Sequence, residues 1–93
     1  MKVLVTGALG FVGANLARYF SEQLGAKVLG IDNRYKLAGS ANNLALIEAA
    51  GVEYKYGDIR NNDDVVRIFN ENGPFDCIFN MAAQVAFKVS VES

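Results

Sequence analysis

The sequence predicts an α/β fold in which about four parallel strands, in the order 3-2-1-4, are covered by helices on both faces. Short apolar runs alternate with segments of helical periodicity along the chain, and a glycine-rich segment lies between the first run and the first helix. An alternation of this kind requires a parallel sheet with right-handed crossovers. The ligand site of such a sheet is expected where the strand order reverses, outside the carboxyl ends of strands 1 and 4.

Length and composition are those of a single soluble domain, residues 1–93. The chain has 93 residues, of which 52% are hydrophobic and 20% are charged, and its net charge is −1. The basic residues are scattered and no apolar run reaches transmembrane length, so neither nucleic acid nor a membrane is an expected partner. Cys77 is the single cysteine, and we expect it to be a buried small hydrophobe in a reducing, cytoplasmic setting. No metal site is predicted.

The first part of the chain carries two predicted strands with a helix between them. Lys2–Thr6 and Lys27–Ile31 are short apolar runs typical of buried strands. The predicted inner face of the helix consists of apolar residues at helical spacing: Leu9, Val12, Leu16, Phe20 and Leu24. Gly25 suits the C-terminal cap of this helix, and residues 32–39 are expected to form a loop.

A second helix and a third strand follow. Ser40 can cap a helix that carries Leu44, Ile47 and Ala50 and that Gly51 ends. Val52–Tyr56 is the third predicted strand.

The last predicted pair is a third helix and a fourth strand. Asn61 or Asn62 can cap this helix, and its first turn contains two aspartates that favour the positive end of the dipole. Its expected inner face consists of Val65, Ile68 and Phe69. Gly73-Pro74 ends the helix, and Phe75–Met81 is the fourth strand. We expect the apolar edge of this strand to be open and to favour self-association, and helix faces without partners could do the same. The tail over residues 84–93 is weakly patterned.

The glycine-rich segment has the spacing G-x-x-G-x-x-G. Gly7 would allow a sharp turn out of the strand, Gly10 a close approach of a diphosphate to the backbone, and Gly13 close packing of the helix on the sheet. The exposed amides here, including those of Phe11 and Val12, would hold the phosphates at the positive end of the helix. The alternative is an ordinary tight turn without a ligand. No Gly-Lys-Ser/Thr follows, which excludes a Walker-type phosphate loop.

An acidic residue lies where a dinucleotide-binding fold needs one. Asp32 ends the second strand about 20 residues after Gly13, a spacing suited to accepting hydrogen bonds from the adenosine ribose hydroxyls. A carboxylate there repels a 2′-phosphate, so NAD is expected in preference to NADP. Asn33 follows directly, and Arg34 could in principle meet such a phosphate. The alternative for Asp32 is a solvated loop carboxylate.

Two further segments follow strands 3 and 4. The Asp58 side chain could accept from an adenine amino group and Ile59 could pack on the ring, or Asp58 could simply cap the turn with Gly57. The last candidates to lie beside the ribose and phosphates are Ala82, Ala83 and Gln84. The alternative for them is a tightly packed start of a helix or loop.

Four segments together resemble one family: Thr6–Gly13, Asp32-Asn33, Gly57–Arg60 and Met81–Gln84. Over essentially its whole length the chain is similar to the extended short-chain dehydrogenase/reductase family, which includes the NAD-dependent epimerases and dehydratases of nucleotide sugars. The resemblance implies the truncated half of a doubly wound Rossmann-type fold that binds NAD.

Other stretches resemble the CDP-tyvelose (CDP-paratose) 2-epimerase branch most, with UDP-glucose 4-epimerases next: Asn42–Leu44, Asp58–Asn61, Ala82–Ala86 and Ser90–Glu92. The chain departs from many members at Ala8, where they carry glycine, and at Asn80, where they carry histidine.

The resemblance implies that bound NAD takes a hydride from a sugar carbon and returns it, with a tyrosine as base and a lysine four residues later. The residues found at that distance from the four tyrosines are Gln23, Gly39, Asp58 and Arg60, so the chain contains no such pair. We therefore predict an N-terminal NAD-binding fragment that is inactive alone, with the nucleotide sugar bound only by a full-length parent. Two alternatives stay open, namely part of a split enzyme that another chain completes and a structural or self-assembling half that binds no cofactor.

Overall fold

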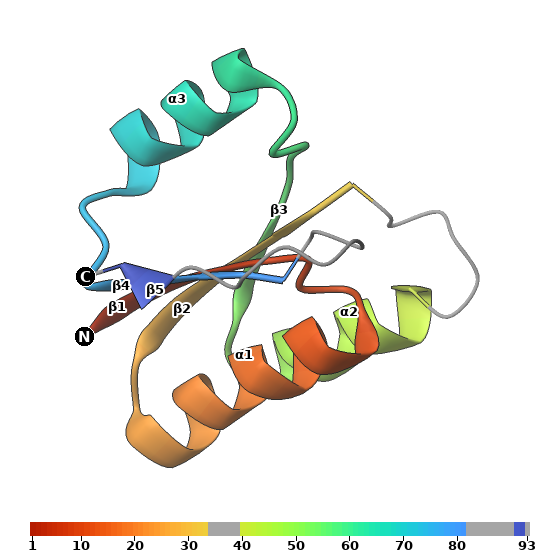
Figure 1. Cartoon of the computed structure of the whole chain (residues 1–93). Coiled ribbons are helices and arrows are strands. Elements are labelled where there is room, and N and C mark those ends of the chain that lie inside the picture. Colours follow the sequence, from red (N-terminus) through yellow and green to blue (C-terminus); the bar gives the residue numbers. More distant parts are fainter. Residues whose placement is uncertain (34–39, 82–90, 93) are drawn as a thin grey trace.

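Within the residues that the structure describes, five strands form one sheet with helices on both faces (Figure 1). The protein is described by a computed structural model that covers residues 1–33, 40–81 and 91–92. The strands are β1 (Lys2–Thr6), β2 (Lys27–Asp32), β3 (Glu53–Tyr56), β4 (Cys77–Asn80) and β5 (Val91–Glu92). The helices are α1 (Phe11–Leu24), α2 (Ser40–Ala49) and α3 (Asn62–Asn72). Figure 1 shows α1 and α2 on one face of the sheet and α3 on the other.

The strand order is β3-β2-β1-β4-β5, which confirms the predicted order 3-2-1-4. The central strand β1 pairs in parallel with β2 on one side and with β4 on the other, so that Leu4 lies between Leu29 and Ile78. Parallel pairing brings the carboxyl ends of β1, β2, β3 and β4 to the same edge of the sheet. The glycine-rich segment after β1 therefore lies at the edge where a ligand site is expected.

The prediction of an open edge at strand 4 is wrong. The two residues of β5 pair antiparallel with β4, with Ile78 opposite Glu92 and Phe79 opposite Val91. These backbone groups satisfy part of the ladder that the apolar edge would otherwise leave open. Self-association stays a prediction. The helix faces remain as the predicted surface for it, because β5 covers the edge of β4.

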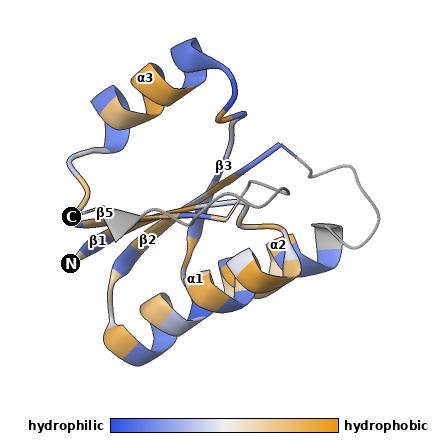
Figure 2. Cartoon of the chain, in the orientation of Figure 1, coloured by the Kyte–Doolittle hydropathy of each residue, from blue (hydrophilic) through white to orange (hydrophobic). Residues whose placement is uncertain are grey.

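Two apolar clusters, one on each face of the sheet, hold the layers together. On the α1 and α2 side the cluster includes Val3, Val5 and Ile47, and on the α3 side it includes Leu4 and Ile68. The alternation along β1 arises because successive strand residues point to opposite faces. Both faces of β1 are buried, which explains why its sequence is a continuous apolar run (Figure 2).

The inner face predicted for α1 is confirmed in part, since Leu9 is buried just before the helix and Phe20 packs against the core. The buried residues of this helix are Gly13, Ala14 and Ala17, whereas Val12 and Leu24 are 57% and 51% exposed. Small side chains let the helix axis approach the sheet closely, while the larger Phe20 ring packs on Phe79 of β4 with the ring centroids 5.0 Å apart. The predicted cap is confirmed, since Gly25 has a φ of 64° and its amide donates to the Phe20 carbonyl.

Other local predictions are confirmed in part. Ile47 and Ile68 are buried as expected, but Phe69 is 40% exposed. The fourth strand is shorter than the predicted Phe75–Met81, and Cys77 at its start is half-buried against the core rather than fully buried. None of the helices in the described ranges is long and apolar enough to cross a membrane.

The structure decides which asparagine caps α3. The Asn61 side-chain oxygen accepts hydrogen bonds from the amides of Asp63 at 2.9 Å and Asp64 at 3.3 Å. Asn62 is the exposed first residue of the helix.

Replacing the capping side chain should destabilise the protein. We expect Asn61→Ala to lower the free energy of unfolding by about 1 kcal/mol, because two amides lose their acceptor. The matched control Asn62→Ala should leave it unchanged or slightly higher, since alanine favours helices. Urea unfolding followed by circular dichroism measures both variants, and equal losses in the two would contradict the assignment of the cap.

Candidate functional site

The chain leaves β1 through a tight glycine turn. Gly7 has a φ of 73°, in the left-handed region that favours glycine, and its amide donates to the Ile31 carbonyl at 2.8 Å. The Ala8 amide donates to the same carbonyl at 3.2 Å, and the Gly10 amide donates to the Gly7 carbonyl at 3.1 Å. These bonds fasten the turn to the end of β2.

Gly13 is required by the packing of α1 on this turn. A Cβ atom at Gly13 would lie 2.1 Å from the carbonyl oxygen of Gly7, which is far inside van der Waals contact. The close approach predicted for Gly13 from the sequence is therefore present. It places the start of α1 directly against the exit of β1.

The N-terminus of α1 has amides outside the helical ladder. The first bond of the helix runs from the Ala14 amide to the Gly10 carbonyl at 2.9 Å, so the amides of Phe11, Val12 and Gly13 precede the ladder. The N-cap residue Gly10 offers no side-chain cap, and the first turn contains no acidic residue. By contrast, α3 has both an asparagine cap and two aspartates. The positive end of α1 is thus better suited to an anion than that of α3.

Asp32 lies at the carboxyl end of β2 beside this turn. It is 5% exposed, and its Oδ2 accepts a hydrogen bond from the Leu9 amide at 2.9 Å. Asp32 is therefore not the solvated loop carboxylate that was the alternative, and it holds the glycine turn in a way that the sequence did not predict. Its carbonyl accepts from the Tyr54 hydroxyl at 2.7 Å, which links the ends of β2 and β3.

Asn43 in α2 also contacts the turn, and no sequence pattern had marked it as a site residue. Its side-chain amide donates to the Leu9 carbonyl at 2.7 Å, although the two residues lie far apart in the chain. No local sequence pattern signals such a contact. The peptide groups of Leu9 are thus held by Asp32 on the amide side and by Asn43 on the carbonyl side.

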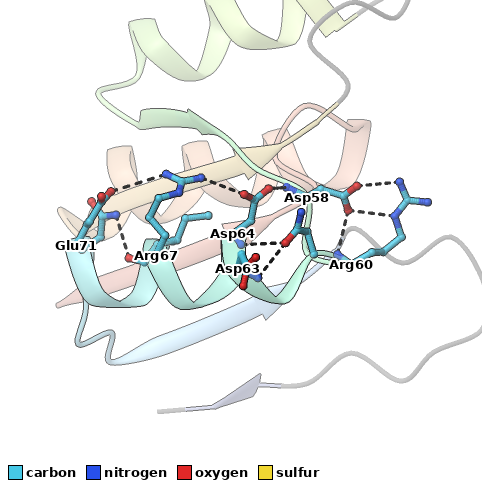
Figure 3. Close-up of polar contacts among 9 residues, drawn as sticks. Asp58, Arg60, Asp63, Asp64, Arg67 and Glu71 are labelled. Carbon is cyan, nitrogen blue, oxygen red and sulfur yellow. Dashed lines mark hydrogen bonds and ion pairs between the residues drawn. The ribbon is translucent and has the colours of Figure 1, made fainter.

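Asp58 forms a bidentate ion pair with Arg60, which we call the Asp58–Arg60 chelate (Figure 3). Its Oδ1 accepts from the Arg60 amide at 2.9 Å and from Nε at 3.0 Å, while its Oδ2 accepts from an Arg60 terminal nitrogen at 2.9 Å. This is the turn-capping arrangement considered as the alternative to adenine recognition. The role of Asp58 toward adenine stays a prediction.

The chelate keeps Asp58 ionised. The side-chain hydrogen bond from Arg60 is the main reason why the pKa of Asp58 falls from 3.8 to about 2, and the Arg60 amide and a hydrogen bond with Asn33 add to it. Figure 3 shows that the network continues along α3, where the Asp64 carboxylate accepts from the Asp58 amide at 3.0 Å and pairs with Arg67. The charges of these carboxylates are thus largely matched within the network.

A hollow of about 230 Å³ lies between α3 and the sheet. Its polar lining comes from the carboxyl ends of β1 and β4, where the Thr6 hydroxyl donates to Asn80 Oδ1 at 2.7 Å, and from Asp58. Ile59 is part of its apolar wall. Sites for drug-sized ligands are larger, about 300–1,000 Å³. This hollow is therefore suited to one ring system rather than to a dinucleotide.

The remaining candidates can be placed only in part. Asn33 follows β2 and bonds with Asp58, whereas Arg34, Ala82, Ala83 and Gln84 lie outside the described residues. Within residues 1–33, 40–81 and 91–92, no group of three or more acidic, cysteine or histidine side chains is arranged to hold a metal ion.

Comparison with known proteins identifies the family. Residues 4–93 match the family described as GDP-mannose 4,6 dehydratase. The chain belongs to this family. It is 38% identical to the CDP-paratose 2-epimerase of Salmonella typhi over 94 residues, which are 100% of the chain and 27% of that enzyme. It is 34% identical to UDP-glucuronate 4-epimerase 2 of Arabidopsis thaliana over 96 residues, 100% of the chain and 22% of that protein. The chain thus spans about a quarter of the length of these relatives.

Solved structures agree with the family and confirm the resemblance seen in the sequence. UDP-glucose 4-epimerase from Bifidobacterium longum, crystallised with NAD+ and UDP, has a TM-score of 0.73 and 27% identity over 89% of this chain and 24% of that one. ADP-L-glycero-D-manno-heptose-6-epimerase of Helicobacter pylori has a TM-score of 0.68 and 32% identity over 94% of this chain and 28% of that one. Both comparisons support the Rossmann-type arrangement of the sheet and its helices.

A methyl group at position 13 should disturb the packing of α1 on the turn. We expect Gly13→Ala to lower the free energy of unfolding by about 1–3 kcal/mol, because the added Cβ collides with backbone rather than with a flexible side chain. The control Asn15→Ala changes an exposed residue of the same helix and should change stability by at most about 0.5 kcal/mol. Urea unfolding measures both, and a neutral Gly13→Ala would contradict the close contact.

The Asp58 carboxyl should titrate at unusually low pH. Carbon-detected NMR should find a midpoint at about 2, and Arg60→Ala should move it back toward 3.8. Because the folded-state pKa is lowered, the stabilisation is complete above about pH 4 and is lost as the pH falls toward 2. The control Arg67→Ala removes a cation that pairs with Asp64 instead, and an equal shift of Asp58 in this variant would contradict the role of Arg60.

Proposed function

We propose that the chain is an NAD-binding module of an NAD-dependent nucleotide-sugar epimerase or dehydratase, and that it is inactive alone. The observation that carries the proposal is the uncapped start of α1, packed on the glycine turn, with Asp32 at the end of the adjacent strand. Amides outside the ladder and an uncompensated helix dipole suit a diphosphate. The NAD-bound epimerase structure from Bifidobacterium longum has a similar fold over this region.

The residues present fit the diphosphate, the adenosine ribose and the adenine of the cofactor. The amides of Phe11, Val12 and Gly13 would hold the diphosphate, and Asp32 would accept from the ribose hydroxyls next to it. The hollow beside Ile59 is large enough for a ring system such as adenine, with Asp58 at its wall. When bound, NAD supplies a hydride acceptor that can later return the hydride.

The residue types in the chain explain why we propose that it does not catalyse a reaction alone. Its four tyrosines lack a lysine four residues later, and it contains no histidine that could act as a base near neutral pH. Its own residues bind and orient the cofactor, and the proton transfer at the sugar requires groups from elsewhere. We propose a nucleotide sugar as the substrate, and the family and relatives such as the CDP-paratose 2-epimerase support this choice.

Calorimetry with NAD and NADP tests the proposal. We expect the chain to bind NAD about tenfold more tightly than NADP, because the Asp32 charge repels a 2′-phosphate. Asp32→Asn should narrow this ratio while its side-chain oxygen still accepts from Leu9, so that the turn stays in place. An absence of binding at millimolar NAD would remove the proposed function.

The control for this measurement is Glu48→Gln. It removes one carboxylate from an exposed position on α2 and changes the net charge equally. The ratio of NAD to NADP affinity should then be that of the unchanged chain. If Glu48→Gln narrows the ratio as much as Asp32→Asn, the preference arises from net charge and not from Asp32.

A further inference from the structure

Leu9 is held by side chains from two other elements of the fold. Its amide donates to Asp32 Oδ2 at 2.9 Å, and its carbonyl accepts from Asn43 Nδ2 at 2.7 Å. Leu9 is 2% exposed and its side chain belongs to the core on the α1 and α2 side. A buried residue in a turn needs such partners because its backbone groups lie away from water. The Asn43 contact, however, affects more than Leu9 itself.

The Leu9 carbonyl determines where α1 can begin. In an α-helix each amide donates to the carbonyl four residues earlier, so a helix that began one residue earlier would use Leu9 as the acceptor for Gly13. In the structure the first bond of this helix instead runs from Ala14 to Gly10. The Asn43 side chain donates to the carbonyl that Gly13 would otherwise use. A carbonyl oxygen has two lone pairs, and the Asn43 donor occupies one of those through which the Gly13 amide could bind Leu9.

We propose that Asn43 is a positioning residue of the phosphate-binding turn. By donating to the Leu9 carbonyl, it keeps the start of α1 at Phe11 and leaves the Gly13 amide available to a diphosphate. The inference rests on the proposed function. It extends the site to α2, from which the sequence had predicted no site residue. Asn43 acts through Leu9 and does not itself contact the ligand.

Two probes separate this role from a merely structural one. ADP carries a diphosphate, whereas adenosine has the same base and sugar without it. We expect Asn43→Ala in the 93-residue chain to lower the affinity for ADP by about tenfold and to change the affinity for adenosine by less than about twofold. NMR titration measures both affinities. A general loosening of α2 would lower the affinities for ADP and adenosine equally, and that result would overturn the proposal.

The neighbouring residue provides a matched control. Asn42 precedes Asn43 on the same helix and is exposed. Asn42→Ala removes an identical side chain and should leave the affinities for ADP and adenosine unchanged. An equal loss of ADP affinity in Asn42→Ala would show that the Leu9 contact is not the cause.

A measurement without ligand keeps the proposal independent of NAD binding. Amide hydrogen exchange at Gly13 should slow by about tenfold in Asn43→Ala, because Gly13 then gains the Leu9 carbonyl as its acceptor. Unchanged exchange would overturn the proposed competition even if ADP affinity fell. If the unaltered chain binds neither NAD nor ADP, the proposed function fails, and the exchange rate still decides the role of Asn43. Should Asn43→Ala not fold, Asn43→Ser shortens the side chain and gives the same two readouts.

Discussion

The contact between Gly13 and the Gly7 carbonyl is the constraint on which the site depends. Only a residue without a Cβ can lie there, since that atom would be 2.1 Å from the oxygen. The contact brings the first turn of α1 against the exit of β1, where the end of β2 also lies. Asp32 and Asn43 can then reach the same residue, Leu9, from different elements. A wider spacing would separate the helix start from both side chains.

Electrostatics distinguishes the start of α1 from the start of α3 at this edge. The N-terminus of α3 is satisfied by the Asn61 side chain, and Asp63 and Asp64 add negative charge to its first turn. The N-terminus of α1 has neither feature. Because the two macrodipoles are compensated differently, the proposed diphosphate would be repelled from α3 and attracted to α1. The chelate between Asp58 and Arg60 places the guanidinium against the carboxylate and limits further repulsion near the carboxyl end of β3.

The sequence predicted the strand order and the local caps because their signals are local or follow from general rules. Alternating strands and helices with right-handed crossovers lead to the order 3-2-1-4, and Asn61 lies within three residues of the amides that it caps. The inner face of α1 was predicted only in part, because periodicity finds large apolar residues such as Phe20 but not the small residues Gly13, Ala14 and Ala17 that close packing selects. The Asn43 contact and β5 could not be predicted, because each depends on partners distant in the sequence.

Asp32 connects the stability of the turn with the proposed choice of cofactor. The same carboxylate that accepts from the Leu9 amide would repel a 2′-phosphate. A side chain without an acceptor at this position would leave a buried amide unsatisfied, which costs about 1–3 kcal/mol. Evolution toward NADP would therefore need a residue that removes the charge but keeps an oxygen for Leu9. The proposed preference for NAD would in this sense be tied to the folding of the turn, and not only to contacts with the ligand.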